Sequence, residues 1–108
     1  MSRSDVLVVS ATKAEAVHVP SEFEVLITGI GKVSAAVAVA SALADYPRTG
    51  KPLVVNIGTA GALHEHHSGL FTPSTVLNHD ISGDAIRALG HDVGDLLACP
   101  TATGPCSR

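Results

Sequence analysis

Residues 24–46 read EVLITGIGKVSAAVAVASALADY, and this stretch decides the expected fold. It begins with Glu24-Val-Leu-Ile-Thr28, an apolar run that is typical of a buried strand. The run closes at Gly29-Ile-Gly31, where glycine permits a tight turn. An Ala/Val/Leu segment without a breaker follows from Val33 to Tyr46, which predicts a helix ending before Pro47.

Two further apolar runs flank this strand–turn–helix unit. Val6-Leu-Val-Val9 predicts a buried central strand, and Leu53-Val-Val55 predicts a third buried strand. Between the first two strands, Ser10 to Val17 has Ala and Glu spaced for a short helix, which Pro20 would stop. The order strand–helix–strand–helix–strand predicts an α/β domain with a mainly parallel or mixed central sheet.

The pattern is weaker downstream. Ser74 to Leu77 predicts another short strand, and Ser82 to Leu89 predicts a short helix with Ser82 as its N-cap. After Gly90 the periodicity fades, and the small, polar residues from Ala98 to Arg108 are expected to form an irregular tail.

Length and composition limit the function classes. The 108 residues suffice for one domain, expected over residues 1–97 with the tail over 98–108. Hydrophobic residues make up 45% and charged residues 16%, which excludes a disordered chain. A formal net charge of -3 argues against nucleic acid as a partner but leaves an uncharged nucleoside open. Since the sequence contains no signal peptide pattern and no membrane span, we expect a cytoplasmic protein.

Ligands of parallel sheets bind beyond the carboxyl ends of the strands. Three segments are expected there: Ser10 to Glu15, Gly29 to Lys32 and Asn56 to Gly61. The first Gly loop is neither a dinucleotide fingerprint nor a P-loop, and a plain strand–helix turn explains it as well as a ligand site does. Asn56-Ile-Gly-Thr-Ala-Gly61 is more informative, because it presents backbone N–H groups and a Thr hydroxyl at a strand end. Glu15 taken alone is interpreted as an ordinary solvated carboxylate.

A metal site is not expected. His64-Glu-His-His67 lacks the second His of the zinc motif, because Ser68 stands at the fifth position, and we interpret the segment as a solvated loop. Cys99 and Cys106 have neither metal-pair nor CxxC spacing and are interpreted as incidental.

Four pieces together resemble the 5′-methylthioadenosine/S-adenosylhomocysteine nucleosidases of the nucleoside phosphorylase superfamily. They resemble, in order, the first strand with the segment carrying the family's catalytic Glu, the GIGK turn, the NTGSAGG strand and loop, and the YHD…FGY stretch. The pieces are Val8-Val-Ser-Ala-Thr-Lys-Ala-Glu15, Gly29-Ile-Gly-Lys-Val33, Val54-Val-Asn-Ile-Gly-Thr-Ala-Gly61, and Asn78-His-Asp80 with Leu89-Gly-His91. The resemblance covers Val6 to Gly94 and implies a three-layer α/β/α phosphorylase/hydrolase-like fold.

The resemblance implies an enzyme that hydrolyses the N-glycosidic bond of a purine nucleoside such as methylthioadenosine or S-adenosylhomocysteine. Glu15 matches the catalytic carboxylate that positions and deprotonates the attacking water. Thr59 matches a Ser of the ribose and water region, Ala60 and Gly61 match the base side, and Ile30 matches a residue that packs on the 5′ substituent. No metal or organic cofactor is implied, and the expected assembly is a homodimer.

Several positions depart from the family. Asn56 stands where related phosphorylases carry an Arg that holds phosphate, which favours hydrolysis over phosphorolysis. Lys13 and Ala14 replace family acidic residues. Nothing after Gly94 resembles the family's later half, with its ribose-binding Met-Glu pair and its purine-protonating Asp, so we expect a truncated fold with weak or no activity. The alternatives are a non-catalytic nucleoside-binding α/β module and an inactive remnant.

Overall fold

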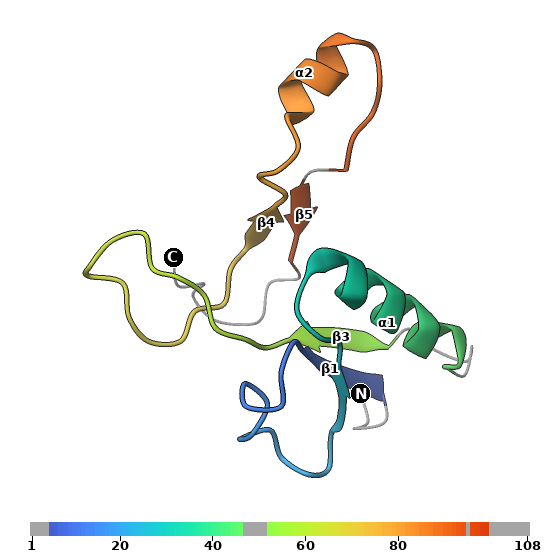
Figure 1. Ribbon diagram of the computed structural model, residues 1–108, viewed down its shortest axis with the longest axis vertical. Helices are drawn as coiled ribbons and strands as arrows, with labels where there is room; N and C mark the ends of the chain where they lie inside the picture. Colours follow the sequence, from blue (N-terminus) through green and yellow to red (C-terminus); the bar gives the residue numbers. More distant parts are fainter. Residues whose placement is uncertain (1–4, 47–51, 95, 100–108) are drawn as a thin grey trace. The chain divides into compact units, whose positions relative to one another are not determined.

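The computed structural model describes residues 5–46, 52–94 and 96–99 (Figure 1). The chain divides into two units, Met1–Gly61 and Ala62–Arg108. It contains two helices among the described residues, a parallel sheet and a small antiparallel one, which confirms the mixed α/β class. The elements are β1 (Val6–Ser10), β2 (Glu24–Ile27), α1 (Lys32–Ala44), β3 (Leu53–Asn56), β4 (Thr75–Leu77), α2 (Gly83–Ala88) and β5 (Leu96–Ala98).

The first unit contains a three-stranded parallel sheet with the strand order β2-β1-β3. Val9 of the central strand pairs with Leu26 on one side and with Asn56 on the other. The residues from Leu7 to Ser10 are buried, each with at most 7% of its surface exposed. The apolar run at the start of the chain therefore forms the buried central strand that the sequence predicts.

The expected burial of the two neighbouring strands is wrong. The side chains of Leu53, Val54 and Val55 in β3 are exposed, and both end residues of β2 are exposed. Among the described residues, each of these strands has a hydrogen-bonded neighbour on one side only. An apolar run forms a fully buried strand only where neighbours and helices cover it, and an edge strand lacks part of that cover.

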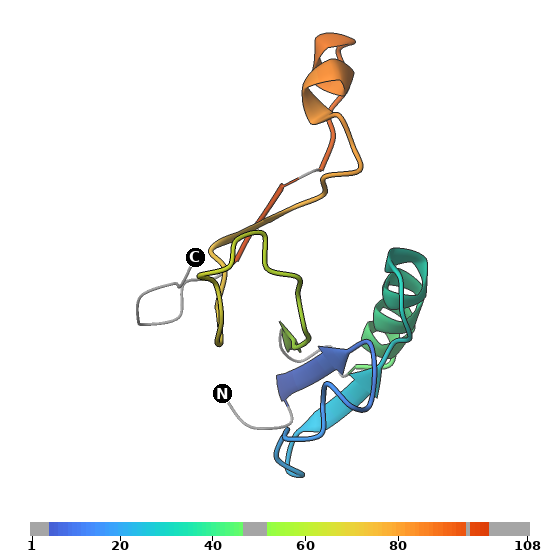
Figure 2. The ribbon, with the colours of Figure 1, turned by 60° about the vertical axis from the view of Figure 1, so that its left-hand side comes forward.

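Helix α1 follows β2 after two glycines with positive φ, Gly29 at 82° and Gly31 at 109°. Side chains rarely adopt this conformation, so the turn requires glycine at both positions. The helix runs alongside the sheet (Figures 1 and 2). Its half-buried residues repeat at the spacing of one helical face. They are Ala35, Ala38, Val39, Ala42 and Leu43.

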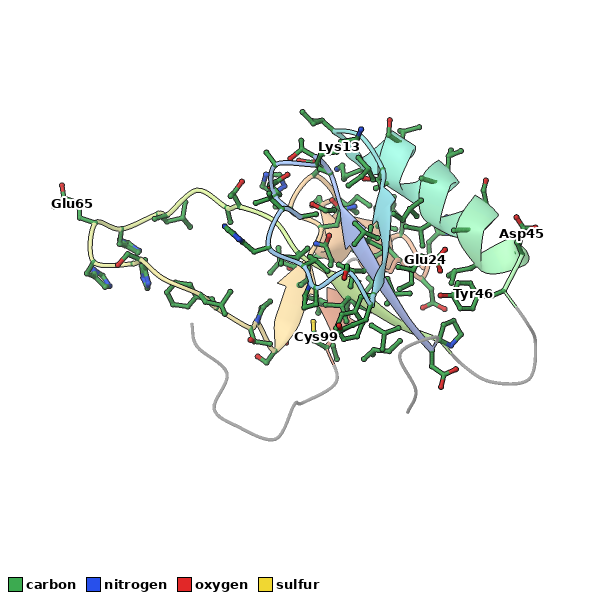
Figure 3. All side chains as sticks on the ribbon, turned by 90° about the horizontal axis from the view of Figure 1, so that it is seen from below. Lys13, Glu24, Asp45, Tyr46, Glu65 and Cys99 are labelled. Carbon is green, nitrogen blue, oxygen red and sulfur yellow. The ribbon has the colours of Figure 1, made fainter. Side chains whose placement is uncertain are left out.

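The carboxyl end of α1 is tied to the sheet by a side-chain hydrogen bond. The hydroxyl of Tyr46 donates to Glu24 Oε2 at 3.2 Å, and Figure 3 shows the two side chains meeting beside the helix end. Helix and edge strand are thereby joined at the end of the sheet where β2 begins.

Residues 11–18 form bends and turns, so the short helix expected from Ser10 to Val17 is wrong. The backbone bonds are of the turn type, from Ala16 N to Lys13 O at 3.2 Å and from Val19 N to Ala16 O at 3.0 Å. Side chains in this segment bind to one another and to the backbone, which offers an alternative to helical bonds. Pro20 prevents any extension that would repay helix nucleation.

The second unit contains β4 and β5, which pair antiparallel with Thr75 opposite Ala98. Helix α2 lies between them in sequence, and its N-cap residue Ser82 makes no side-chain capping bond. β5 was not predicted, because the hydrophobic periodicity of the sequence fades after Gly90. Since Cys99 N also donates to Ser74 O at 2.8 Å, the chain is still paired where the tail was expected to begin. Residues 100–108 of that tail lie outside the described residues.

Candidate functional site

Three loops leave the parallel sheet side by side at the carboxyl ends of its strands. Two backbone bonds join the loops after β1 and β2, from Thr28 N to Ser10 O at 2.9 Å and from Gly29 N to Ala11 O at 3.2 Å. Ile57 N donates to Val9 O at 2.9 Å and fixes the start of the loop after β3. This edge is where the sequence predicts a ligand site.

The carboxylate of Glu15 connects the loop after β1 with the loop after β3. Glu15 Oε2 accepts two hydrogen bonds from Thr59, at 2.7 Å from the backbone N–H and at 2.8 Å from the hydroxyl. The two residues are 44 positions apart in the chain. The structure thus brings together the predicted catalytic residue and the predicted ribose-region residue.

The second carboxylate oxygen is held from within the same loop. Thr12 Oγ1 donates to Glu15 Oε1 at 2.8 Å and accepts a bond from the backbone N–H of Glu15 at 3.3 Å. The sequence interpretation did not single out Thr12. The signal was present as the spacing Thr-x-x-Glu, the pattern of reciprocal capping bonds at the start of a helical turn.

These hydrogen bonds favour the ionised form of Glu15. The backbone N–H of Thr59, followed by the hydroxyls of Thr12 and Thr59, lowers the pKa of Glu15 below its ordinary value of 4.5. Partial burial opposes this shift but is outweighed. Donors bind a carboxylate better than a carboxylic acid, so Glu15 is ionised at neutral pH. It is available as a proton acceptor and as a negative charge.

Gly58 gives the carboxylate room to approach the loop. A Cβ atom at this position would lie 3.1 Å from Glu15 Oε2, closer than most carbon–oxygen contacts. By contrast, a Cβ atom at Gly31 or Gly61 would meet no other atom within 4 Å. Gly58, which precedes Thr59 in the NIGTAG loop, therefore allows the close approach of the Glu15 carboxylate.

The remaining predicted site residues are exposed. Ile30 lies in the loop between β2 and α1 with 82% of its surface exposed. Ala60 and Gly61 are exposed directly after Thr59. These three residues are open to an incoming ligand, and the contacts that organise Glu15 come instead from Thr12 and Thr59.

The His-rich loop lies in the second unit. His66 and His67 have ring centroids 4.2 Å apart, and His64 lies 5.6 Å from each of them. Glu65 points outward from the same loop (Figure 3). Within residues 5–46, 52–94 and 96–99, no group of three His, Cys, Asp or Glu side chains is arranged to hold a metal ion. His79 and Asp80 form an exposed pair, with Nδ1 and Oδ1 2.8 Å apart.

Comparisons with known protein families, with curated proteins and with solved structures find no match to this chain. Across the described part of the chain, neither helix has the length and apolar character needed to cross a bilayer.

Proposed function

We propose that the chain is an N-glycosidase that hydrolyses purine nucleosides, with Glu15 as its catalytic carboxylate. The supporting observation is the contact between Glu15 and Thr59, which assembles an ionised carboxylate and a Gly-containing loop at the carboxyl edge of a parallel sheet. The resemblance to methylthioadenosine/S-adenosylhomocysteine nucleosidases supplies the substrate class. The proposal includes the family's three-layer fold, a cytoplasmic homodimer, and no metal or organic cofactor.

Glycosidic bond cleavage builds positive charge on the sugar, and a nearby carboxylate stabilises that charge. The bond to the purine breaks with its electron pair going to the base nitrogen, and a water oxygen bonds to the anomeric carbon. With a lowered pKa, Glu15 is a weak base. It accepts the proton once the water is bonded to the cationic carbon and has become acidic. Solvent protonates the departing purine in this scheme.

Water is the favoured nucleophile because of the residue at the end of β3. Asn56 is uncharged and cannot provide the bidentate hydrogen bonds with which Arg holds phosphate. Hydrolysis therefore releases the free base and the free sugar without a requirement for phosphate.

The test is release of purine base by the purified chain from methylthioadenosine, S-adenosylhomocysteine, adenosine and inosine, followed by chromatography. We expect slow release that does not depend on phosphate. Glu15→Gln keeps the size of the side chain but loses the charge, and we expect it to lower the rate by about 10²- to 10⁴-fold. Base release at the spontaneous rate for all four nucleosides, or an equal rate for Glu15→Gln, would contradict the proposal.

A non-catalytic nucleoside-binding module is the second candidate. It is favoured by the three protein hydrogen bonds to Glu15, which also suit a carboxylate that only links two loops. Calorimetric titration with the same nucleosides separates the two candidates, because a binding module gives heat of binding without release of base.

A further inference from the structure

The hydrogen bonds to Glu15 leave its two oxygens unequal. An ionised carboxylate offers about four lone pairs, two on each oxygen. Oε2 accepts both bonds from Thr59, and Oε1 accepts one bond from Thr12. Among the described residues, the donors therefore fill Oε2 and leave one lone pair of Oε1 open.

We propose that Thr12 is a positioning residue, which holds the Glu15 carboxylate so that the open lone pair of Oε1 is the proton acceptor for the attacking water. The proposal rests on the nucleosidase function, since it names the atom at which that reaction deposits the proton. It adds a residue that neither the sequence interpretation nor the family resemblance had assigned.

The hydroxyl of Thr12 has a fixed direction. It accepts the backbone N–H of Glu15 at 3.3 Å, and its single proton points to Oε1 at 2.8 Å. Donor and acceptor lie three residues apart in one turn, so the contact is local in sequence. The rotation of the carboxylate about its last bond is then limited from both sides, by Thr12 at Oε1 and by Thr59 at Oε2.

Loss of the hydroxyl releases one side of this arrangement. In Thr12→Val the side chain keeps its shape, but Oε1 loses its donor and the carboxylate turns about the Thr59 contacts. Thr12→Ser keeps the donor. Thr12→Ala removes the donor without adding a methyl group, so it separates the loss of the hydroxyl from a packing defect caused by valine.

The experiment measures the titration of the Glu15 side-chain carboxyl by ¹³C NMR, and base release from methylthioadenosine as a function of pH. We expect the pKa of Glu15 to rise toward 4.5 in Thr12→Val and Thr12→Ala and to stay at the wild-type value in Thr12→Ser. In the same two variants, the acid limb of the plot of base-release rate against pH should move to higher pH. At neutral pH the two variants without a hydroxyl should lose about 10- to 100-fold in kcat/KM.

Thr75→Val is the matched control, because Thr75 is an exposed threonine in β4 and lies outside the site. It should match the wild type in both measurements. An unchanged Glu15 titration in Thr12→Val and Thr12→Ala would overturn the positioning role. If the wild type releases no base, the nucleosidase proposal fails, and the positioning role at Oε1 fails with it; the titration then shows whether the Thr12 contact exists.

Discussion

Glu15 illustrates how neighbours convert an ordinary residue into a candidate catalytic group. A glutamate in a surface turn is usually solvated, and the sequence offers no reason by itself to treat Glu15 differently. In the structure its carboxylate accepts hydrogen bonds from Thr12 and from Thr59, while Gly58 leaves space for it. The position of the Glu15 carboxylate thus depends on three other residues.

At the residue scale we predict that Gly58→Ala disturbs Glu15 more than it disturbs folding. Gly58 is not among the glycines with positive φ, so alanine fits the backbone, and the stability should change by less than about 1 kcal/mol. The new Cβ atom would press on Oε2 of Glu15 and lengthen its bonds to Thr59. We expect the Glu15 pKa to rise and the rate of base release to fall by about tenfold.

NMR titration, thermal unfolding and the rate of base release measure these effects. Gly94→Ala is the control, since a Cβ atom there meets nothing within 4 Å. A Glu15 titration in Gly58→Ala that coincides with the wild type would show that the close approach is unimportant.

At the element scale the site depends on strand order. The order β2-β1-β3 brings the loops after β1 and β3 next to each other, although the strands are separated in sequence by β2 and α1. The bonds between Glu15 and Thr59 then act as a cross-link between these two loops. This link stabilises the sheet more strongly when Glu15 is ionised than when it is protonated.

The stability contribution of this link should depend on pH. The folded pKa of Glu15 lies below the 4.5 of the unfolded chain. The contribution is therefore fully present above about pH 4.5 and is lost as the pH falls through the lower, folded value. We expect the difference in melting temperature between the wild type and Glu15→Gln to be constant near neutral pH and to shrink in acid. If the difference in melting temperature grew as the pH fell, it would contradict a lowered pKa of Glu15 in the folded chain.

At the scale of the whole molecule, little apolar surface is buried. The buried hydrophobic side chains of the described residues are Leu7, Val8 and Val9, all in β1. Exposed large apolar side chains occur in both units, including Val37 in α1 and Leu97 in β5. Surfaces of this kind, together with open strand edges, favour association with other chains.

We therefore predict that the purified chain associates with itself. Light scattering after size-exclusion chromatography should give a mass above the 11.0 kDa of one chain, increasing with concentration. The homodimer proposed from the family resemblance would be one form of such association. A monodisperse monomer that unfolds cooperatively would refute this prediction, because it would show that the exposed apolar side chains need no cover.

The sequence by itself determined the local features of this protein. Continuous apolar runs predicted β1, β2 and β3, the glycine pair predicted the turn into α1, and the order of the elements predicted a parallel sheet with loops gathered at one edge. Only the tertiary structure decided that β2 and β3 are exposed edges and that β5 exists. The hydrophobic pattern of a segment indicates its own secondary structure, whereas its burial and its strand pairing depend on the segments that lie beside it. For the same reason the contact of Glu15 with Thr59, across 44 positions, required the folded sheet.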